Sequence, residues 1–355
     1  WTKKKATKNK INLNDLKKIK FEEAFIKVIS SPNHSNKKWV TEQYDQMVMG
    51  DTIERTGSNA AIIKIHNKEK AIAVTVDSSA NYCKSHPLSG GKQIVCESWR
   101  NLISVGAKPI AITNCLNFGN PENPEVMGEF AENILGIKEA CEFLDYPVVS
   151  GNVSFYNGTN KNNIYPTPVI GGVGLIKNLK KIHNHRLKKI DSKIIVVGKT
   201  FGHLGQSVYL NELYNLHEGM PPEVNLLNEK NNGETVLNLI KKNYIKSAHD
   251  VSLGGILTSI AKMCIMGNKG VKLKKTKSLI NEFEFFFGED QARYIIEIEK
   301  NDFKKVMEIL NKNSVHFDEL GIVTEKDIFI DDKLKITSEE LVLSNNKWLK
   351  NYMST

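Results

Sequence analysis

The sequence predicts an α/β (α+β) fold divided into two domains. Its 355 residues suffice for two hydrophobic cores. Apolar runs of strand length alternate with segments whose apolar residues recur at helical spacing. A polar, lysine-rich passage at 177–192 interrupts this alternation and is typical of a domain boundary. We therefore expect a linker and short helix at 1–30, a first domain at 31–190 and a second domain at 191–355.

The first domain is expected to begin with a β-hairpin. Apolar segments at 60–66 and 71–76 flank a polar Asn-Lys-Glu-Lys stretch, which is a hairpin pattern. Before them, a turn-forming Ser-Pro-Asn sequence leads into His34, and we expect this histidine on the surface. The preceding linker ends in apolar residues spaced as in a short helix: Leu16, Ile19, Phe21 and Phe25.

The rest of the first domain alternates between predicted helices and strands. Apolar residues keep helical spacing from Lys92 to Val105, and Gly106 follows as a typical residue after a helix end. Residues 125–144 form the clearest amphipathic helix. Three segments are predicted as strands, the first two of them buried: 109–113, 147–149 and 168–176.

The second domain is expected to open with the buried strand 194–198, followed by a glycine-containing turn into a helix at 202–207. A strand end at 247–252 leads into a further helix. Adjacent residues rarely face each other productively, so we interpret His249 and Asp250 as domain core and phosphate-loop scaffolding. A charged cluster after an aromatic run is interpreted as a solvated, salt-bridged turn: Glu289, Asp290, Gln291 and Arg293.

The stretch 147–157 carries the densest set of candidate binding residues. Ser150, Gly151 and Asn152 are expected to break the short strand and to expose backbone amides, a composition suited to close approach by a phosphate or a metal-bound oxygen. Ser154 adds a hydroxyl group shortly afterwards. Taken by itself, this segment leaves a plain strand ending in a loop as an open alternative.

Composition argues against several functional classes. The net charge of +9 comes mostly from scattered lysines, so we do not expect a nucleic-acid partner. The five cysteines show no Cys-x-x-Cys spacing, which fits a reducing cytoplasm with neither disulfides nor a zinc site. No apolar run reaches the length of a transmembrane helix, so no membrane association is expected. Because the chain opens with Trp1, we expect a fragment or a processed product.

Motifs along the chain resemble one enzyme family. They are Gly-Ala-Lys-Pro-Ile-Ala-Ile-Thr-Asn at 106–114, Leu-Asn-Phe-Gly-Asn-Pro-Glu at 116–122, Tyr-Pro-Thr-Pro-Val-Ile-Gly at 165–171, His-Asp-Val-Ser at 249–252 and Phe-Gly-Glu-Asp-Gln-Ala-Arg-Tyr at 287–294. In this order they are similar to the second (C-terminal) half of phosphoribosylformylglycinamidine synthase, the large synthetase subunit of purine biosynthesis. The likeness extends from about Ser31 to Leu349.

This resemblance implies a PurM-like architecture and a ligase function. In that architecture an N-terminal module, whose sheet pairs into a shared β-barrel, precedes an α/β C-terminal module. The full enzyme carries two such pairs, so 1–190 would pack against the equivalent module of the first half. The family uses ATP and Mg²⁺ to convert formylglycinamide ribonucleotide into formylglycinamidine ribonucleotide through an iminophosphate. A glutaminase subunit supplies the ammonia, and a small accessory subunit joins the complex.

The resemblance also assigns roles to single residues. Gly151 would contact ATP through its backbone, Asn152 would offer an oxygen to Mg²⁺, and Ser154 would hydrogen-bond the substrate. Asn114 stands where the family has an ATP-contacting aspartate, and Asn81 stands where it has an arginine. The resemblance places the catalytic histidine and the main magnesium carboxylates in the first half. We therefore expect no catalytic residue here, and no activity from this chain alone.

Two alternatives stay open at this point. The first is a non-catalytic nucleotide-binding or interaction module, because Asn114 and Leu253 both depart from the aspartates usual in the family. The second is another ATP-using member of the superfamily, such as aminoimidazole ribonucleotide synthetase. The motif at 116–122 argues against this second alternative.

Overall fold

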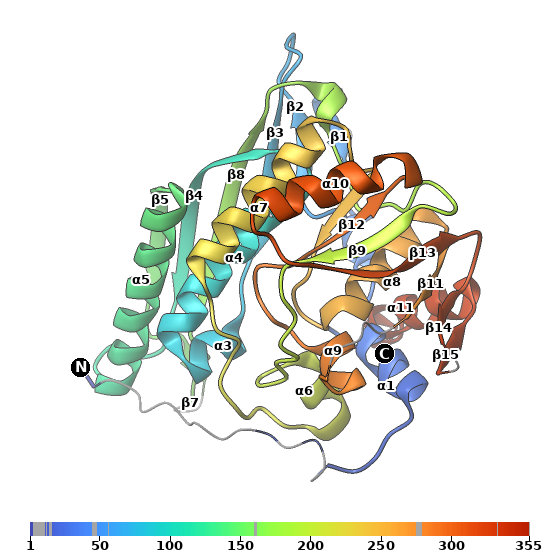
Figure 1. The fold of residues 1–355 in the computed structure, drawn as a ribbon. Helices are drawn as coiled ribbons and strands as arrows, with labels where there is room; N and C mark the ends of the chain where they lie inside the picture. Colours follow the sequence, from blue (N-terminus) through green and yellow to red (C-terminus); the bar gives the residue numbers. More distant parts are fainter. Residues whose placement is uncertain are drawn as a thin grey trace.

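A computed structural model of the chain describes residues 1–2, 11, 13, 16–44, 48–55, 57–159, 162–274, 279–331 and 333–354 (Figure 1). The predicted linker therefore lies partly outside the described residues, whereas the short helix predicted after it is present as α1 (Phe21–Ile29). None of the helices within the described ranges is long and apolar enough to cross a membrane. The fold is mixed α/β, as the sequence predicts.

The first sheet has six strands in the order β1-β2-β3-β8-β4-β5. The predicted hairpin is confirmed, because β2 and β3 pair antiparallel. Strands β4 and β5 are parallel, and β8 pairs antiparallel with both β3 and β4. The strand bounds are β1 (Thr52–Glu54), β2 (Ala61–Lys64), β3 (Ala71–Asp77), β4 (Lys108–Asn117), β5 (Val148–Ser154) and β8 (Thr167–Ile176), with a separate small ribbon of β6 (Gly158–Thr159) and β7 (Asn162–Asn163).

Three helices cover one face of this sheet: α3 (Ala80–Ser85), α4 (Pro87–Ser104) and α5 (Pro124–Leu144) (Figure 1). The helix predicted at 125–144 is confirmed, and its start is fixed by the Asn123 side chain, which accepts a hydrogen bond of 2.9 Å from the Glu125 amide. Helix α4 ends where predicted, and Gly106 has φ of +83°, a value that favours glycine after a helix.

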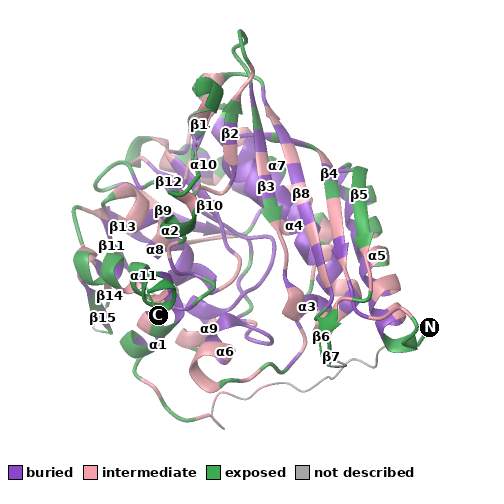
Figure 2. Ribbon diagram, turned by 180° about the vertical axis from the view of Figure 1, so that it is seen from behind, coloured by how far each residue is buried: buried purple, intermediate pink, exposed green. Residues whose placement is uncertain are grey.

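The opposite face of the first sheet is open and apolar. Ile63 and Ile72 are cross-strand partners with 44% and 38% exposure, and Val76 is 75% exposed. Figure 2 shows this face from behind, with no helix in front of it. The prediction that 109–113 and 147–149 are buried strands was wrong: β4 alternates between exposed and buried residues, and Val148 and Val149 on the edge strand β5 are exposed. The sheet is open in this chain and does not close into a barrel by itself.

The second sheet has seven strands in the order β10-β12-β9-β13-β11-β14-β15. Its strands are β9 (Lys193–Val197), β10 (Ser247–Asp250), β11 (Gly270–Leu273), β12 (Tyr294–Ile298), β13 (Phe317–Thr324), β14 (Ile328–Ile330) and β15 (Leu334–Ile336). Its helices are α6 (Val208–Tyr214), α7 (Leu226–Lys241), α8 (Gly255–Gly267), α9 (Glu282–Phe287), α10 (Lys300–Lys312) and α11 (Ser338–Met353); short helical turns lie at α2 (Lys38–Thr41), Val48–Gly50 and Leu179–Lys181.

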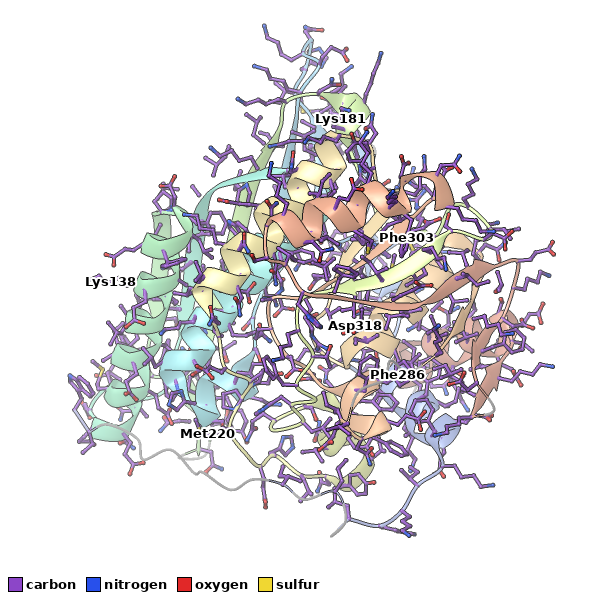
Figure 3. The ribbon with its side chains drawn as sticks, in the orientation of Figure 1. Lys138, Lys181, Met220, Phe286, Phe303 and Asp318 are labelled. Carbon is purple, nitrogen blue, oxygen red and sulfur yellow. The ribbon has the colours of Figure 1, made fainter. Side chains whose placement is uncertain are left out.

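Two hydrophobic cores hold these layers together. The first joins Trp99 of α4 to Ile195 of β9 and Val236 of α7, so it crosses from one sheet to the other. The second packs α1 onto α8, α9 and the far side of the second sheet. In it the Phe21 ring lies 5.7 Å from that of Phe286, which is labelled in Figure 3 and is fully buried. The chain thus forms one packed body around its two sheets.

Candidate functional site

The parallel pairing of β4 and β5 brings the predicted site residues together. Asn114 is the register partner of Gly151, and the pairing continues as far as Ser154. The expectation that residues 150–152 break the strand was wrong, because β5 runs through them without interruption. The reason is the position of β5 at the sheet edge. Its side chains are exposed there, so polar residues can sit in the strand without being desolvated.

Gly151 has a packing reason to be glycine. A Cβ atom placed on it would lie 2.0 Å from Oδ1 of Asn114 and 2.7 Å from the Asn114 backbone oxygen. Both contacts are far shorter than van der Waals separation, so the Asn114 amide occupies the space that a side chain at 151 would need. The Asn114 side chain therefore packs directly against the backbone of Gly151.

The four candidate residues divide between the two faces of the sheet. Successive residues of a strand point to opposite faces, so Gly151 shares its face with Asn114, whereas Asn152 and Ser154 share the other. Asn114 faces the helical layer, where it lines a pocket against α5. Asn152 and Ser154 therefore lie on the face that no helix covers (Figure 2). A single ligand can contact both pairs only by passing the free edge of β5 or the end of the strand.

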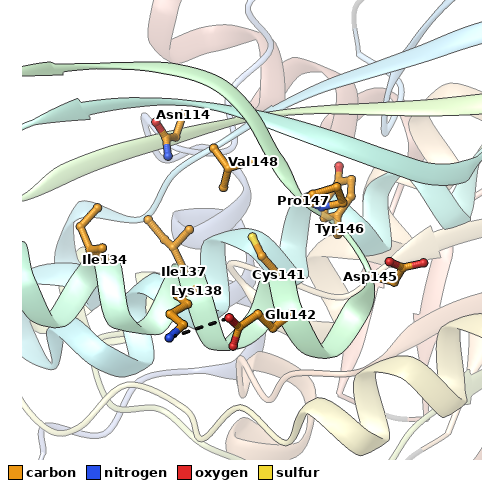
Figure 4. A pocket seen from close by; sticks show the side chains of 10 residues that line it. All are labelled: Asn114, Ile134, Ile137, Lys138, Cys141, Glu142, Asp145, Tyr146, Pro147 and Val148. Carbon is orange, nitrogen blue, oxygen red and sulfur yellow. Dashed lines mark ion pairs between the residues drawn. The ribbon is translucent and has the colours of Figure 1, made fainter.

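The pocket beside Asn114 has a volume of about 410 Å³ and lies between α5 and the edge of the sheet (Figure 4). Its walls are mostly apolar, and an ion pair of 3.8 Å between Lys138 and Glu142 lies at its rim. This volume is within the range of small-molecule sites. The remaining lining residues are Ile134, Ile137, Cys141, Asp145, Tyr146, Pro147 and Val148.

Hydrogen bonds fix the end of β5. The Asn157 amide donates to the backbone oxygen of Phe118 and to the hydroxyl oxygen of Ser154, each at 3.0 Å. These contacts tie the end of the strand to the loop after β4, which carries the Asn-Phe-Gly sequence. The Ser154 hydroxyl is thus held in place and can still form a further hydrogen bond, whereas Asn152 is exposed.

Three carboxylates that the sequence did not single out lie close together: Asp77, Glu97 and Asp250. Burial and the nearby carboxylates of Glu97 and Asp250 raise the pKa of Asp77 well above its usual range. Burial and Asp250 likewise raise the pKa of Glu97. One oxygen of Asp77 accepts a hydrogen bond of 2.8 Å from Asn101, while Oδ2 of Asp77 and Oδ2 of Asp250 are buried without a partner. These residues are 173 positions apart at the extremes (250 minus 77), so no local motif unites them.

Asp250 differs from its neighbours in the cluster. Burial by itself would raise the pKa of its carboxyl group, but the hydrogen bond and charge of His249 outweigh that effect and lower the pKa. His249 Nδ1 lies 3.1 Å from Asp250 Oδ1, so the expectation that these neighbours do not face each other was wrong. Among the described residues, no group of three or more His, Cys, Asp or Glu side chains is arranged to hold a metal ion.

The charged cluster at 289–293 is buried, contrary to the solvated turn predicted for it. Glu289 accepts hydrogen bonds from the amides of Val208 at 2.9 Å and Gly254 at 2.7 Å, and a further one from the Tyr82 hydroxyl of α3. Burial is the main reason that the pKa of Glu289 is raised to about 7. This carboxylate therefore links the starts of α6 and α8 to α3.

A buried ion pair makes a second link between distant segments, here between α4 and α7. Arg100 of α4 donates to Glu229 of α7 at 2.6 Å and to Gln291 at 3.1 Å, and both Arg100 and Glu229 are fully buried. His34 is also buried, at 6% exposure, although the sequence placed it on the surface. Its turn is present, but Asn345 of α11 donates to the His34 backbone oxygen at 2.9 Å and so covers the turn.

Comparison with known proteins identifies the family. The model for "AIR synthase related protein, N-terminal domain" matches residues 57–176, and the model for the corresponding C-terminal domain matches 189–333. The PurL subunit of phosphoribosylformylglycinamidine synthase from Pelagibacter ubique is 57% identical over 354 residues, or 99% of this chain and 48% of that protein. This chain belongs to the PurL family. The PurL subunit from Azorhizobium caulinodans is 43% identical over 94% of the chain and 46% of its own length.

Solved PurL structures share the fold. Thermotoga maritima PurL complexed with FGAR superposes with a TM-score of 0.73 at 15% identity, covering 90% of this chain and 53% of that one. The same protein complexed with ATP gives 0.69 at 16% identity, covering 92% and 52%. The PurL-family chain therefore spans about half the length of the relatives it matches. Thiamine-monophosphate kinase from Stenotrophomonas maltophilia has a related fold, at a TM-score of 0.56 and 14% identity, covering 80% and 92%.

Proposed function

We propose that this chain forms the C-terminal half of a PurL synthetase, the ATP-dependent ligase that converts formylglycinamide ribonucleotide (FGAR) into formylglycinamidine ribonucleotide. The observation that carries the proposal is the 57% identity over 99% of the chain to a PurL subunit of which it spans 48%. Similarity of that degree along nearly the whole chain supports a half of PurL over another member of the superfamily. The five cysteines are all free, which suits a cytoplasmic enzyme.

The base of ATP is assigned to the pocket beside Asn114. The apolar walls of this pocket suit a planar ring, and the Asn114 amide offers both a donor and an acceptor to the edge of a base. Gly151 supports this role because it leaves room for the Asn114 side chain. The phosphates would then run past the edge strand β5 to the open face, where Asn152 and Ser154 lie. In this arrangement Ser154 orients the substrate.

Two groups in the chain fit Mg²⁺. Asn152 presents an exposed amide oxygen on the open face. The carboxylate cluster of Asp77, Glu97 and Asp250 holds buried oxygens without partners, which a cation would satisfy. Magnesium in nucleotide sites takes one or two carboxylates and completes its shell with phosphate and water oxygens, so a cage of three side chains is not required. When bound, the ion would supply neutralisation of phosphate charge.

The open face of the first sheet supports a partner for this half. The exposed side chains of Ile63, Ile72 and Val76 are clustered on one face of the sheet. Apolar residues that are clustered in this way, unlike scattered ones, indicate an interaction surface. We propose that the equivalent module of the N-terminal half covers it, because two such sheets facing each other would bury both apolar surfaces. A glutaminase subunit and a small accessory subunit complete the proposed complex, in keeping with the solved structure entitled PurLQS from Thermotoga maritima.

Growth of a purine auxotroph tests the function. A bacterial strain lacking PurL needs added purines, and we expect growth without them when this chain and the N-terminal half of the Pelagibacter ubique relative are expressed together. Neither half should support growth by itself. Failure of the pair to restore growth, although both halves accumulate and copurify, would favour a non-catalytic module.

A further inference from the structure

A second pocket, remote from the β4–β5 site, lies where the C-terminal helix α11 passes the end of α1. Ser30, Lys347, Trp348, Asn351 and Tyr352 line it, and its volume is about 420 Å³. Four of these residues come from the last two turns of α11 and one from the cap of α1. The pocket shares no residue with the pocket beside Asn114.

Aromatic surface forms one wall of this pocket. The rings of Trp348 and Tyr352 are one helical turn apart, with centroids 5.1 Å apart and planes 10° from parallel. Tyr352 remains 64% exposed, so part of this stack is accessible from solvent. Such a surface can accept a further planar ring, because stacking on an aromatic side chain depends on the ring face and not on its substituents.

Positive charge surrounds the aromatic wall. The Lys37 ammonium lies 5.6 Å from the Trp348 ring centroid, beside the pocket, and donates hydrogen bonds to the backbone oxygens of Pro32 and Ser35. Lys347 and Lys350 are exposed on α11, and no described acidic side chain forms an ion pair with either. From Leu341 to Ser354 the sequence of α11 contains no Asp or Glu. The pocket therefore favours an anion.

A polar side chain completes the lining. Asn351 is exposed, and its amide makes no hydrogen bond to any described residue. It can offer a donor and an acceptor side by side, which matches the edge of a purine base. An aromatic surface, an amide and the Lys347 ammonium line one pocket, and these are the groups that recognise a ring, its edge and a phosphate.

We propose that the α11 pocket binds a purine nucleoside monophosphate, with the base against the Trp348–Tyr352 stack and the phosphate near Lys347. A flexible acidic peptide would use the same lysines, but it would leave the exposed ring and the Asn351 amide without matching groups. The pocket volume is at the lower end of the range for ligand sites, which suits a ligand with one phosphate. This site does not depend on the proposed function of the chain.

Binding of AMP tests the assignment. Calorimetric titration of the chain should give saturable binding at submillimolar AMP, and ribose 5-phosphate, which has no base, should bind at least tenfold more weakly. Tyr352→Ala and Lys347→Glu should each weaken AMP binding about tenfold, equivalent to about 1.4 kcal/mol. Lys312→Glu, at the end of α10, is the matched control and should leave binding unchanged. Both altered side chains are exposed, so the variants should fold.

Four results would overturn the proposal. The first three are the absence of saturable AMP binding, binding that survives Lys347→Glu and Tyr352→Ala unchanged, and binding lost in Asn114→Ala while it survives in both α11 variants. In the third case AMP would be assigned to the pocket beside Asn114. Tighter binding of a glutamate-rich peptide than of AMP, weakened by the same two substitutions, would identify the pocket as a protein-docking site and would also overturn the assignment.

Discussion

Replacement of Gly151 by alanine should destabilise the fold, because Asn114 already occupies the space for a side chain. The added Cβ would lie 2.0 Å from Asn114 Oδ1 and 2.7 Å from the Asn114 backbone oxygen. The side chain can rotate away, but the backbone oxygen belongs to a paired strand and must shift with it. Overpacking of this kind costs about 1–3 kcal/mol of unfolding free energy. An alanine in an unhindered strand position would instead be neutral or slightly stabilising.

Urea denaturation of four variants measures this effect. Ser150→Ala, the exposed neighbour, is the control and should stay within about 0.5 kcal/mol of the parent. The pair Asn114→Ala and Gly151→Ala should be less destabilised than the sum of the single variants, by about 0.5 kcal/mol or more, because the first removes one of the two clashes. A Gly151→Ala variant as stable as the parent, or strict additivity in the pair, would refute the packing argument.

Three further predictions concern the ligand site and a buried carboxylate. Asn152→Ala should weaken Mg²⁺-dependent ATP binding in the reassembled enzyme while changing stability by less than about 1 kcal/mol; unchanged magnesium dependence would make Asn152 purely structural. Asn114→Asp should raise ATP affinity by about tenfold or less, the value of one ordinary hydrogen bond, whereas a gain of several hundredfold would mean that this chain has lost its nucleotide site. Because the pKa of Glu289 is raised from 4.5 to about 7, the folded state holds a proton that the unfolded state has lost in this window. Unfolding free energy should therefore fall as pH rises from 4.5 to 7, and Glu289→Gln should flatten this slope; an identical slope in the variant would contradict the assignment.

The sequence predicts correctly those helices and strands that depend on residues close to them in the chain. The helix at 125–144 has a side-chain cap, a proline in its first turn and an apolar stripe, and it folds where these signals place it. The hairpin around 67–70 likewise follows from its own alternation. Pairing of Asn114 with Gly151 was not predictable in this way, because it depends on the register between two strands separated by α5.

Burial was the property that the sequence predicted least well. The apolar segment 147–149 has the composition of a buried strand, yet Val149 lies exposed on an edge strand beside an uncovered face. Glu289 and Arg293 are charged, yet they are buried because backbone amides, Tyr82 and Thr200 supply their hydrogen bonds. In each case the deciding partner comes from a distant segment, which local composition does not reveal.

The most direct test of the central claim is the rate of formylglycinamidine ribonucleotide formation from FGAR, ATP and ammonia. The assay compares this chain, the N-terminal half of the Pelagibacter ubique relative, and their equimolar mixture. We expect turnover only from the mixture, saturating at one copy of each half, because a phosphoryl-transfer site missing its charge-neutralising residues loses most of its rate. Turnover by this chain alone, or a stable complex of the two halves without turnover, would contradict the account.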